Sequence, residues 1–199
     1  MGARRRLSPD ARRDELLDVG GRLFATHPYR DVLMQDVAAA AGVSRALLYQ
    51  YFPTKRDLFA GVYERAAQRL LAATTLDDDT PLLDQVAAGL DAHIDYFTEN
   101  RQTVLAANRD LAGDPVIQAI ITDELAVLRQ RLLDNLPVDE DRRELLSAVL
   151  MSWLIFVRSL SVEWLTRPSC SRDELRDICA ATLVAALTTV TAPRTGATD

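Results

Sequence analysis

Apolar residues recur every three or four positions along most of this sequence, which is typical of amphipathic helices. No segment alternates apolar and polar residues for long enough to predict a strand. The pattern therefore predicts an all-α chain. The main apolar stripes run through residues 16–24, 58–70, 82–97, 117–132, 146–157 and 175–186.

Signals for helix starts stand beside several prolines. Ser8, Thr80 and Asp114 each precede a proline, the order expected for a helix cap followed by the first helical residue. Residues 54–57 and 171–174 resemble capping boxes, in which the first side chain and the fourth satisfy each other's backbone amides. These marks divide the chain into separate helices.

Two short apolar stripes follow one another between residues 34 and 52. Gly42 can adopt a positive φ at the end of the first helix, and Ser44 can cap the second. Two short helices joined by a glycine-containing turn are typical of a helix-turn-helix, although a generic helical hairpin gives the same pattern. The second helix presents side chains suited to DNA bases and phosphates on its outer face. They are Arg45, Ala46, Tyr49 and Gln50.

Charge is distributed unevenly along the 199 residues, whose formal net charge is −6. Residues 1–56 hold ten basic and six acidic side chains, whereas residues 57–199 hold 13 basic and 23 acidic ones. This asymmetry favours a basic end that meets a polyanion. Arg4, Arg5 and Arg6 could be an arm along the DNA or a solvated tail.

Several classes of protein and site are not expected. The chain has two cysteines and two histidines, none at a metal-ligand spacing, and it contains none of the common catalytic motifs. We therefore expect no metal, no cofactor and no enzymatic activity. No apolar segment follows the N-terminal arginines, and the most apolar run, residues 145–157, is too short to span a bilayer. A soluble cytoplasmic protein without a membrane partner is predicted.

Residues 37–58 resemble the helix-turn-helix of the tetracycline-repressor (TetR/AcrR) family. That family's pattern reads roughly I-A-x-x-A-G-V-S-x-G-T-L-Y-x-Y-F-x-S-K-x-x-L, and the specific match covers about residues 9–60. The resemblance implies a three-helix DNA-binding domain over residues 1–56. It also implies a ligand-binding and dimerisation bundle over residues 57–199, with about nine helices in the whole chain.

The resemblance also implies which residues meet DNA. Arg45, Ala46 and Gln50 match base-facing positions, and Gln35 matches a base-reading or backbone-reading position. Phosphate contacts are expected from side chains around the second helix and the start of the next one. The complete set is Gln35, Ser44, Arg45, Ala46, Leu47, Tyr49, Gln50, Tyr51, Thr54 and Lys55.

The chain departs from the family pattern at two places. Ala46-Leu47 stands where the family has Gly-Thr, so one hydroxyl contact to phosphate is lost and Leu47 could touch a thymine methyl instead. Leu33 stands where the family has a capping threonine, and Asp31 could cap one turn earlier. Both departures bear on the operator and on affinity.

Polar groups on apolar stripes, with neighbouring aromatics, are the candidates for a ligand pocket. Each has a plainer alternative as a satisfied core residue, a surface charge or an intersubunit ion pair. Arg158 could pair with a ligand carboxylate, with Asp95 or with Glu99. The candidates are His93, Phe97, Arg101, Asn108, Ser152, Trp153, Phe156 and Arg158.

The last two predicted helices, residues 139–166 and 171–191, carry broad apolar faces. A dimer interface and a plain monomer core both explain them. For a homodimer, which would place two helix-turn-helix units on a palindrome, the expected contacts are Leu146, Leu150, Val157, Ile178, Thr182 and Leu183.

The sequence thus predicts a regulator, a repressor in the first instance, that leaves a palindromic operator when a small, largely apolar effector binds. Two alternatives stay open: a DNA-binding regulator without an effector, and a small helical carrier or enzyme. The effector, the operator, the target genes, the sign of regulation and the role of Cys170 cannot be read from the sequence.

Overall fold

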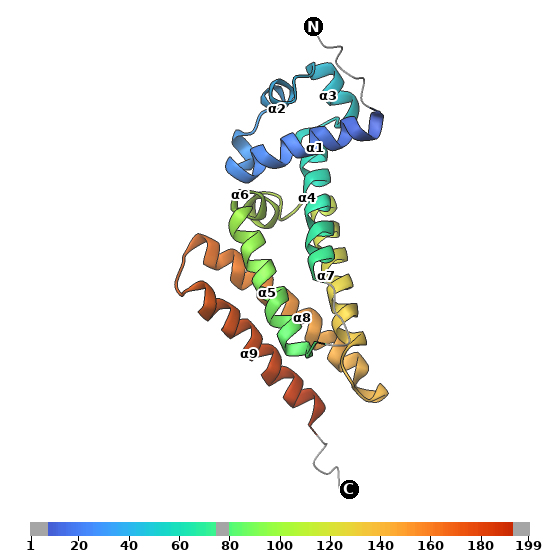
Figure 1. The fold of residues 1–199 in the computed structure, drawn as a ribbon, viewed down its shortest axis with the longest axis vertical. Helices are drawn as coiled ribbons and strands as arrows, with labels where there is room; N and C mark the ends of the chain where they lie inside the picture. The colour runs from blue at the N-terminus through green and yellow to red at the C-terminus, as the bar shows by residue number, and fades with distance from the viewer. Residues whose placement is uncertain (1–7, 75–79, 193–199) are drawn as a thin grey trace. The chain divides into compact units, whose positions relative to one another are not determined.

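The computed structural model describes residues 8–74 and 80–192, and the secondary structure in these ranges is entirely helical (Figure 1). This confirms the all-α prediction. The elements, in chain order, are α1 (Pro9–Thr26), η1 (Tyr29–Asp31), α2 (Met34–Ala40), α3 (Arg45–Tyr51), α4 (Lys55–Ala73), α5 (Leu82–Glu99), α6 (Arg101–Leu105), the π-helical turn η2 (Ala106–Asp110), α7 (Pro115–Asp134), α8 (Glu140–Thr166) and α9 (Arg172–Thr191).

The chain forms two compact units. The first comprises Met1–Ala67 and Glu99–Ile120, and the second comprises Gln68–Thr98 and Ile121–Asp199. Helices α4 and α7 each begin in the first unit and end in the second. The functional boundary predicted after residue 56 falls inside the first unit, and it stays a prediction.

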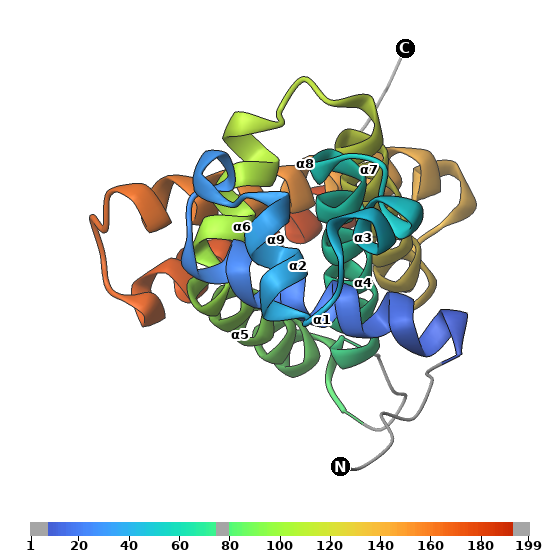
Figure 2. The ribbon, with the colours of Figure 1, turned by 90° about the horizontal axis from the view of Figure 1, so that it is seen from above.

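The first unit contains the short helices α2 and α3, which pack against each other, while α1 packs against α2 and α6 (Figure 2). Gly42 has a φ of 62° in the turn between α2 and α3, as its position predicted. The small apolar stripe of α2 is buried, and Leu48 of α3 is fully buried. The turn and the two stripes therefore form a helix-turn-helix.

Aromatic side chains fill the centre of the first unit. The Phe59 ring meets the Phe24 ring edge-on at 5.1 Å and the Tyr29 ring at 5.2 Å. Gly20 allows α1 to approach α4 closely, because a Cβ at this position would lie 3.2 Å from Leu58 Cδ1. This packing holds the start of α4 against α1.

The predicted caps are confirmed at five helix starts, among them that of α3, which Ser44 caps. The hydroxyl of Ser8 accepts a bond from the Ala11 amide, and Asp114 accepts from the first amides of α7. Residues 54–57 and 171–174 form reciprocal capping boxes. The prediction for Thr80 is wrong: α5 begins at Leu82, and Pro81 stands at the cap position, where its carbonyl accepts from the Asp84 and Gln85 amides.

In the second unit, α8 and α9 lie side by side (Figure 1). The indole Nε1 of Trp153 on α8 donates a 2.9 Å bond to the Cys179 carbonyl on α9. This bond joins the two helices inside the unit. Burial raises the pKa of the Cys179 thiol to about 11, so this cysteine packs as a neutral group.

Four residues expected at a dimer interface are instead buried within the single chain. Their side chains point into the core that α8 and α9 share with the rest of the second unit, so another protein cannot reach them. They are Leu146, Leu150, Val157 and Leu183. Periodicity identified the apolar faces of the two helices, but not which part of each face the chain itself covers.

Helix α8 is long and apolar enough, by length and composition alone, to cross a membrane. The apolar run expected from the sequence, residues 145–157, was shorter because it ended before Arg158, whereas the helix continues to Thr166. A buried core helix has the same composition, and 44% of the most apolar segment of α8 is buried in the protein. The lack of a membrane partner stays a prediction.

Candidate DNA-binding surface and ligand cavity

Helix α3 presents a polar outer face. Arg45, Tyr49 and Gln50 are exposed, whereas Leu48 on the opposite side is buried. Among the described residues, Arg45 has no ion-pair partner, so its guanidinium is available to an acceptor outside the chain. Ala46 is also exposed and Leu47 is half-buried. The structure thus brings the expected base-facing residues together on one helix.

Ser44 and Thr54 have structural roles as helix caps. The Ser44 hydroxyl accepts a 3.2 Å bond from the Leu47 amide and begins α3. The Thr54 hydroxyl donates a 2.8 Å bond to Asp57 and accepts from the Asp57 amide. Both residues remain exposed. Caps of this kind fix the residues at which α3 and α4 begin.

Lys55 is held by the first unit itself. Its Nζ donates to the Tyr29 carbonyl at 2.8 Å and to the Arg30 carbonyl at 3.3 Å, and it lies 4.4 Å from the centre of the Tyr29 ring. An ammonium group has three donors, so one remains for a phosphate. Desolvation by burial is the main cause that raises the pKa of Tyr29, which stays a neutral phenol beside this cation.

The start of α2 has no side-chain cap. Leu33 occupies the cap position, without a capping bond from its side chain, and it is exposed. Asp31 lies in η1 and does not cap α2. Gln35 is exposed in the first turn of α2. The three N-terminal arginines of the expected arm lie outside the described residues.

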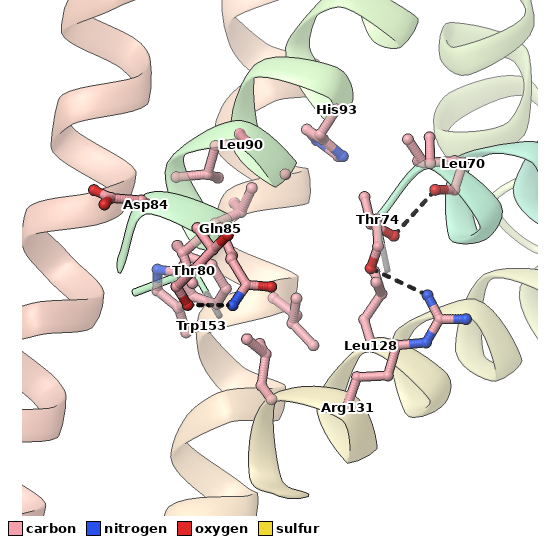
Figure 3. A pocket seen from close by; sticks show the side chains of 17 residues that line it. Leu70, Thr74, Thr80, Asp84, Gln85, Leu90, His93, Leu128, Arg131 and Trp153 are labelled. Atoms are coloured by element: carbon pink, nitrogen blue, oxygen red, sulfur yellow. Dashed lines mark hydrogen bonds between the residues drawn. The ribbon is translucent and has the colours of Figure 1, made fainter. Parts of the chain in front are cut away.

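The second unit contains a cavity of about 320 Å³ (Figure 3). This volume is at the lower end of the range for small-molecule sites. Leucine, valine and alanine side chains form most of its wall, together with Trp153. The lining residues are Leu70, Ala73, Thr74, Thr80, Asp84, Gln85, Val86, Ala88, Gly89, Leu90, His93, Leu128, Arg131, Leu132, Trp153, Leu154 and Val157.

His93 is the polar group at one side of this cavity. Its Nε2 is buried and has no hydrogen-bond partner in the described residues, and its ring contacts the Phe97 ring at 3.9 Å between centroids, tilted by 35°. Burial, and then the charge of Arg158, lower the pKa of His93 to about 3. The imidazole is therefore neutral at physiological pH.

Arg158 pairs with Glu124 rather than with Asp95 or Glu99. Its Nη1 lies 3.6 Å from Glu124 Oε2, and its guanidinium lies 5.6 Å from the centre of the Phe97 ring. The carboxylate of Asp95 is instead bound by Arg172 at 2.7 Å. Burial is the main cause that raises the pKa of Glu124, while Arg158 opposes it. The sequence could not reveal this partner, which lies on another helix.

The other predicted ligand residues are divided among three places. Phe97 and Arg158 lie next to His93 but do not line the cavity, whereas Trp153 does line it. Ser152 and Phe156 border a shallow groove along α8 and α9. Arg101 and Asn108 belong to the first unit. The predicted set is therefore not one pocket.

Several lining residues carry no clear signal in the sequence, among them Thr74, Gln85 and Arg131. Arg131 donates from Nη1 to the Leu71 carbonyl at 2.5 Å and to the Thr74 carbonyl at 3.2 Å, and so caps the end of α4. Its position beside the apolar stripe of α7 was the available signal. No group of three or more histidine, cysteine or acidic side chains suited to a metal occurs in the part of the chain that the structure describes.

The helix-turn-helix segment matches a known protein family. The family model described as "Bacterial regulatory proteins, tetR family" matches residues 16–62, which run from α1 into α4. Residues 16–62 are thus a helix-turn-helix segment of the tetR family. The tetR-family regulators that this segment resembles are not enzymes, and the likeness supports DNA as a partner.

Two curated tetR-family relatives illustrate the likeness. The transcriptional activator FasR of Mycolicibacterium smegmatis is 30% identical over 117 residues, which are 57% of this chain and 53% of FasR. The regulator AlkX of Mycobacterium tuberculosis is 32% identical over 111 residues, 55% of this chain and 47% of AlkX. The match thus spans about half the length of these relatives.

The fold as a whole is also that of a solved tetR-family structure. A tetR-family regulator from Streptomyces coelicolor superimposes with a TM-score of 0.82 at 23% identity, covering 92% of this chain and 83% of that one. The likeness therefore extends beyond the helix-turn-helix to the helices that form the cavity.

Proposed function

We propose that this tetR-family chain is a homodimeric transcriptional repressor that binds a palindromic operator and leaves it when a small, largely apolar effector binds. The observation that carries the proposal is the exposed face of α3, where Arg45, Tyr49 and Gln50 stand together on a helix-turn-helix. A guanidinium and an amide are the side-chain groups that read guanine and adenine in the major groove.

A dimer supplies the second reading helix, because one helix-turn-helix contacts too few bases for a specific site. Exposed apolar side chains on α8 and α9 support this part of the proposal. They are Leu145, Ile155 and Phe156 on α8 and Ile178 and Val184 on α9. Ile178 and Thr182 are the two contacts expected from the sequence that are exposed, and Thr182 borders the groove between the helices.

The interface has its own test. Phe156→Asp with Ile178→Asp should convert the dimer to a folded monomer in sedimentation velocity, because it places four charges in one two-fold interface. Val127→Asp changes an exposed apolar residue of α7 and serves as the control. A wild-type chain that sediments as a monomer would contradict the dimer.

Coupling to an effector is proposed through α4. The end of this helix lines the cavity at Leu70, Ala73 and Thr74, and its start follows the helix-turn-helix directly. An effector that favours one position of α4 would change the fit of the two α3 helices to DNA. A coupling of about 1–3 kcal/mol gives a 5–150-fold change in affinity.

The operator experiment tests the central claim. Fluorescence anisotropy with a palindromic fragment from upstream of the chain's own gene should show specific binding. The logarithm of the association constant should fall by about 0.9 per neutralised phosphate for each tenfold rise in salt concentration. Equal affinity for unrelated DNA would contradict the proposal. FasR is named an activator, so a promoter reporter must determine whether this chain activates or represses transcription. Reporter expression that rises when the gene for this chain is deleted supports repression.

A further inference from the structure

The polar groups around the cavity of the second unit differ in how well they are satisfied. Gln85 donates from Nε2 to the Thr80 carbonyl at 2.7 Å, and the Thr74 hydroxyl donates to the Leu70 carbonyl at 3.0 Å. Arg131 is bound to two carbonyls at the end of α4. In contrast, Nε2 of His93 is buried without a partner among the described residues.

A buried polar atom without a partner costs stability unless water or a ligand satisfies it. The ring of His93 projects from α5 into the cavity (Figure 3), whose wall is otherwise mostly apolar. A ligand with one hydrogen-bonding group at this end would satisfy Nε2 and bury its apolar remainder against the wall.

Charge around the cavity disfavours a cation. Arg158, although paired with Glu124, lowers the pKa of His93, so a second cation beside this ring is disfavoured. Asp84, which lines the cavity, is exposed, and its carboxylate points away from the other labelled side chains in Figure 3. A cation at His93 would therefore lack a counterion.

An anion is disfavoured for a different reason. The guanidinium of Arg131 already binds the Leu71 and Thr74 carbonyls, and the negative end of the α4 dipole offsets part of its charge. A carboxylate bonded to Nε2 of His93 would be buried beside a neutral imidazole, because Figure 3 places Arg131 on the far side of Thr74 from His93. Burying an unpaired charge is costly.

We propose that this cavity binds an uncharged, mainly apolar alcohol, whose hydroxyl forms a hydrogen bond with Nε2 of His93. A hydroxyl can donate and accept, so it suits either tautomer of the neutral imidazole. At about 30 Å³ per water-sized group, the cavity has room for a ligand of roughly ten non-hydrogen atoms. This inference rests on the proposed function, since it names the class of the effector.

Three probes with the same ten-carbon chain test the charge preference: decan-1-ol, decanoate and decylammonium. Isothermal titration with the full-length protein should give an affinity for decan-1-ol at least about tenfold higher than for either charged chain. Equal or tighter binding of decanoate or decylammonium, or no binding of the alcohol, would overturn the inference.

Variants test the role of His93 itself. His93→Leu should weaken decan-1-ol binding about 3- to 10-fold, the usual range for one neutral hydrogen bond, and His93→Gln should restore most of it. His27→Leu removes the other histidine of the chain, which is exposed in the first unit, and should leave binding unchanged. An unchanged affinity in both His93 variants would exclude a bond to this residue.

The two proposals fail separately. Operator binding is measured on the same samples without any probe. If the chain binds the operator specifically but prefers a charged probe, only the proposal of an alcohol ligand is overturned. If the chain binds the alcohol tightly but does not bind the operator specifically, the proposed regulatory function is overturned and the proposed ligand class is supported.

Discussion

Arg158 and Glu124 form an ion pair inside the second unit, with 3.6 Å between Nη1 and Oε2, although both side chains are more than nine-tenths buried. The pair links α8 to α7, and the same guanidinium lies over the Phe97 ring. An ion pair of this kind is costly to break from one side, because the remaining charge stays buried.

Arg158→Ala should therefore destabilise the chain by about 3–5 kcal/mol, measured by urea unfolding at neutral pH. The double variant Arg158→Leu/Glu124→Leu should be much less destabilised, because it leaves no lone charge. Arg143→Ala is the control: this exposed arginine pairs with Asp134 at 3.0 Å, and its loss should cost no more than about 1 kcal/mol. Equal losses in Arg158→Ala and Arg143→Ala would contradict a structural role for the buried pair.

His93 should make stability depend on pH. Its pKa is about 6.5 when exposed and about 3 in the folded chain, so the unfolded chain binds more protons between these values. Stability should consequently fall as the pH decreases from 6.5 towards 3. Urea unfolding at several pH values measures how the free energy of unfolding depends on pH. His93→Leu should reduce this dependence by the equivalent of up to one bound proton, whereas His27→Leu should not alter it. A slope identical to that of the wild type in His93→Leu would exclude the neutral buried imidazole.

Arg45 should contribute sequence discrimination. Arg45→Ala should weaken binding to the preferred operator by about 1–3 kcal/mol and relax the preference at a single base pair. The reason is that its guanidinium, which has no ion-pair partner among residues 8–74 and 80–192, is available for a bidentate contact. Competition binding with operators substituted one base pair at a time measures the effect. Uniform weakening across all substituted operators would instead assign Arg45 to the phosphates.

Lys55 should behave differently, because it has two tasks. Lys55→Ala should weaken binding to all DNA sequences alike and make the salt dependence shallower by about one unit. It should also lower the free energy of unfolding by about 0.5–1.5 kcal/mol, since its bonds to the Tyr29 and Arg30 carbonyls are lost. An unchanged salt slope with lowered stability would leave Lys55 with the structural task alone.

Gly42 should be sensitive to a single methyl group. Its φ of 62° is strained for any residue with a Cβ, so Gly42→Ala should cost about 1–2 kcal/mol of stability. Gly113→Ala is the control, because φ at Gly113 is not positive and its Cβ would meet no atom within 4 Å. Thermal unfolding of the two variants makes the comparison. Equal melting temperatures would show that the turn tolerates alanine.

The sequence was informative wherever neighbouring residues determine the structure. Ser8, Ser44 and Ser171 cap the helices they precede, because a cap bonds an amide only two or three residues away. Gly42 turns the chain for the same local reason. Consequently the helix-turn-helix and the outward side of α3 could be predicted before any coordinates.

Contacts between distant segments could not be predicted in this way. Lys55 bonds carbonyls 25 and 26 residues away, and Arg131 reaches the end of α4. Periodicity marks an apolar face but does not say what covers it. For this reason Leu146 and Leu150 were expected at a partner and are found in the core, whereas Phe156 is exposed.

The sequence by itself determined the all-helical class, the helix boundaries near their caps, and the family to which the DNA-binding segment belongs. Only the tertiary structure decided that Arg158 faces Glu124 and that the ends of α4 and α7 close one cavity with α5 and α8. It also decided that His93 has a buried nitrogen with no hydrogen-bond partner in the described part of the chain. The physical reason is range: caps and turns act over a few residues, while burial and ion pairing depend on which helices meet.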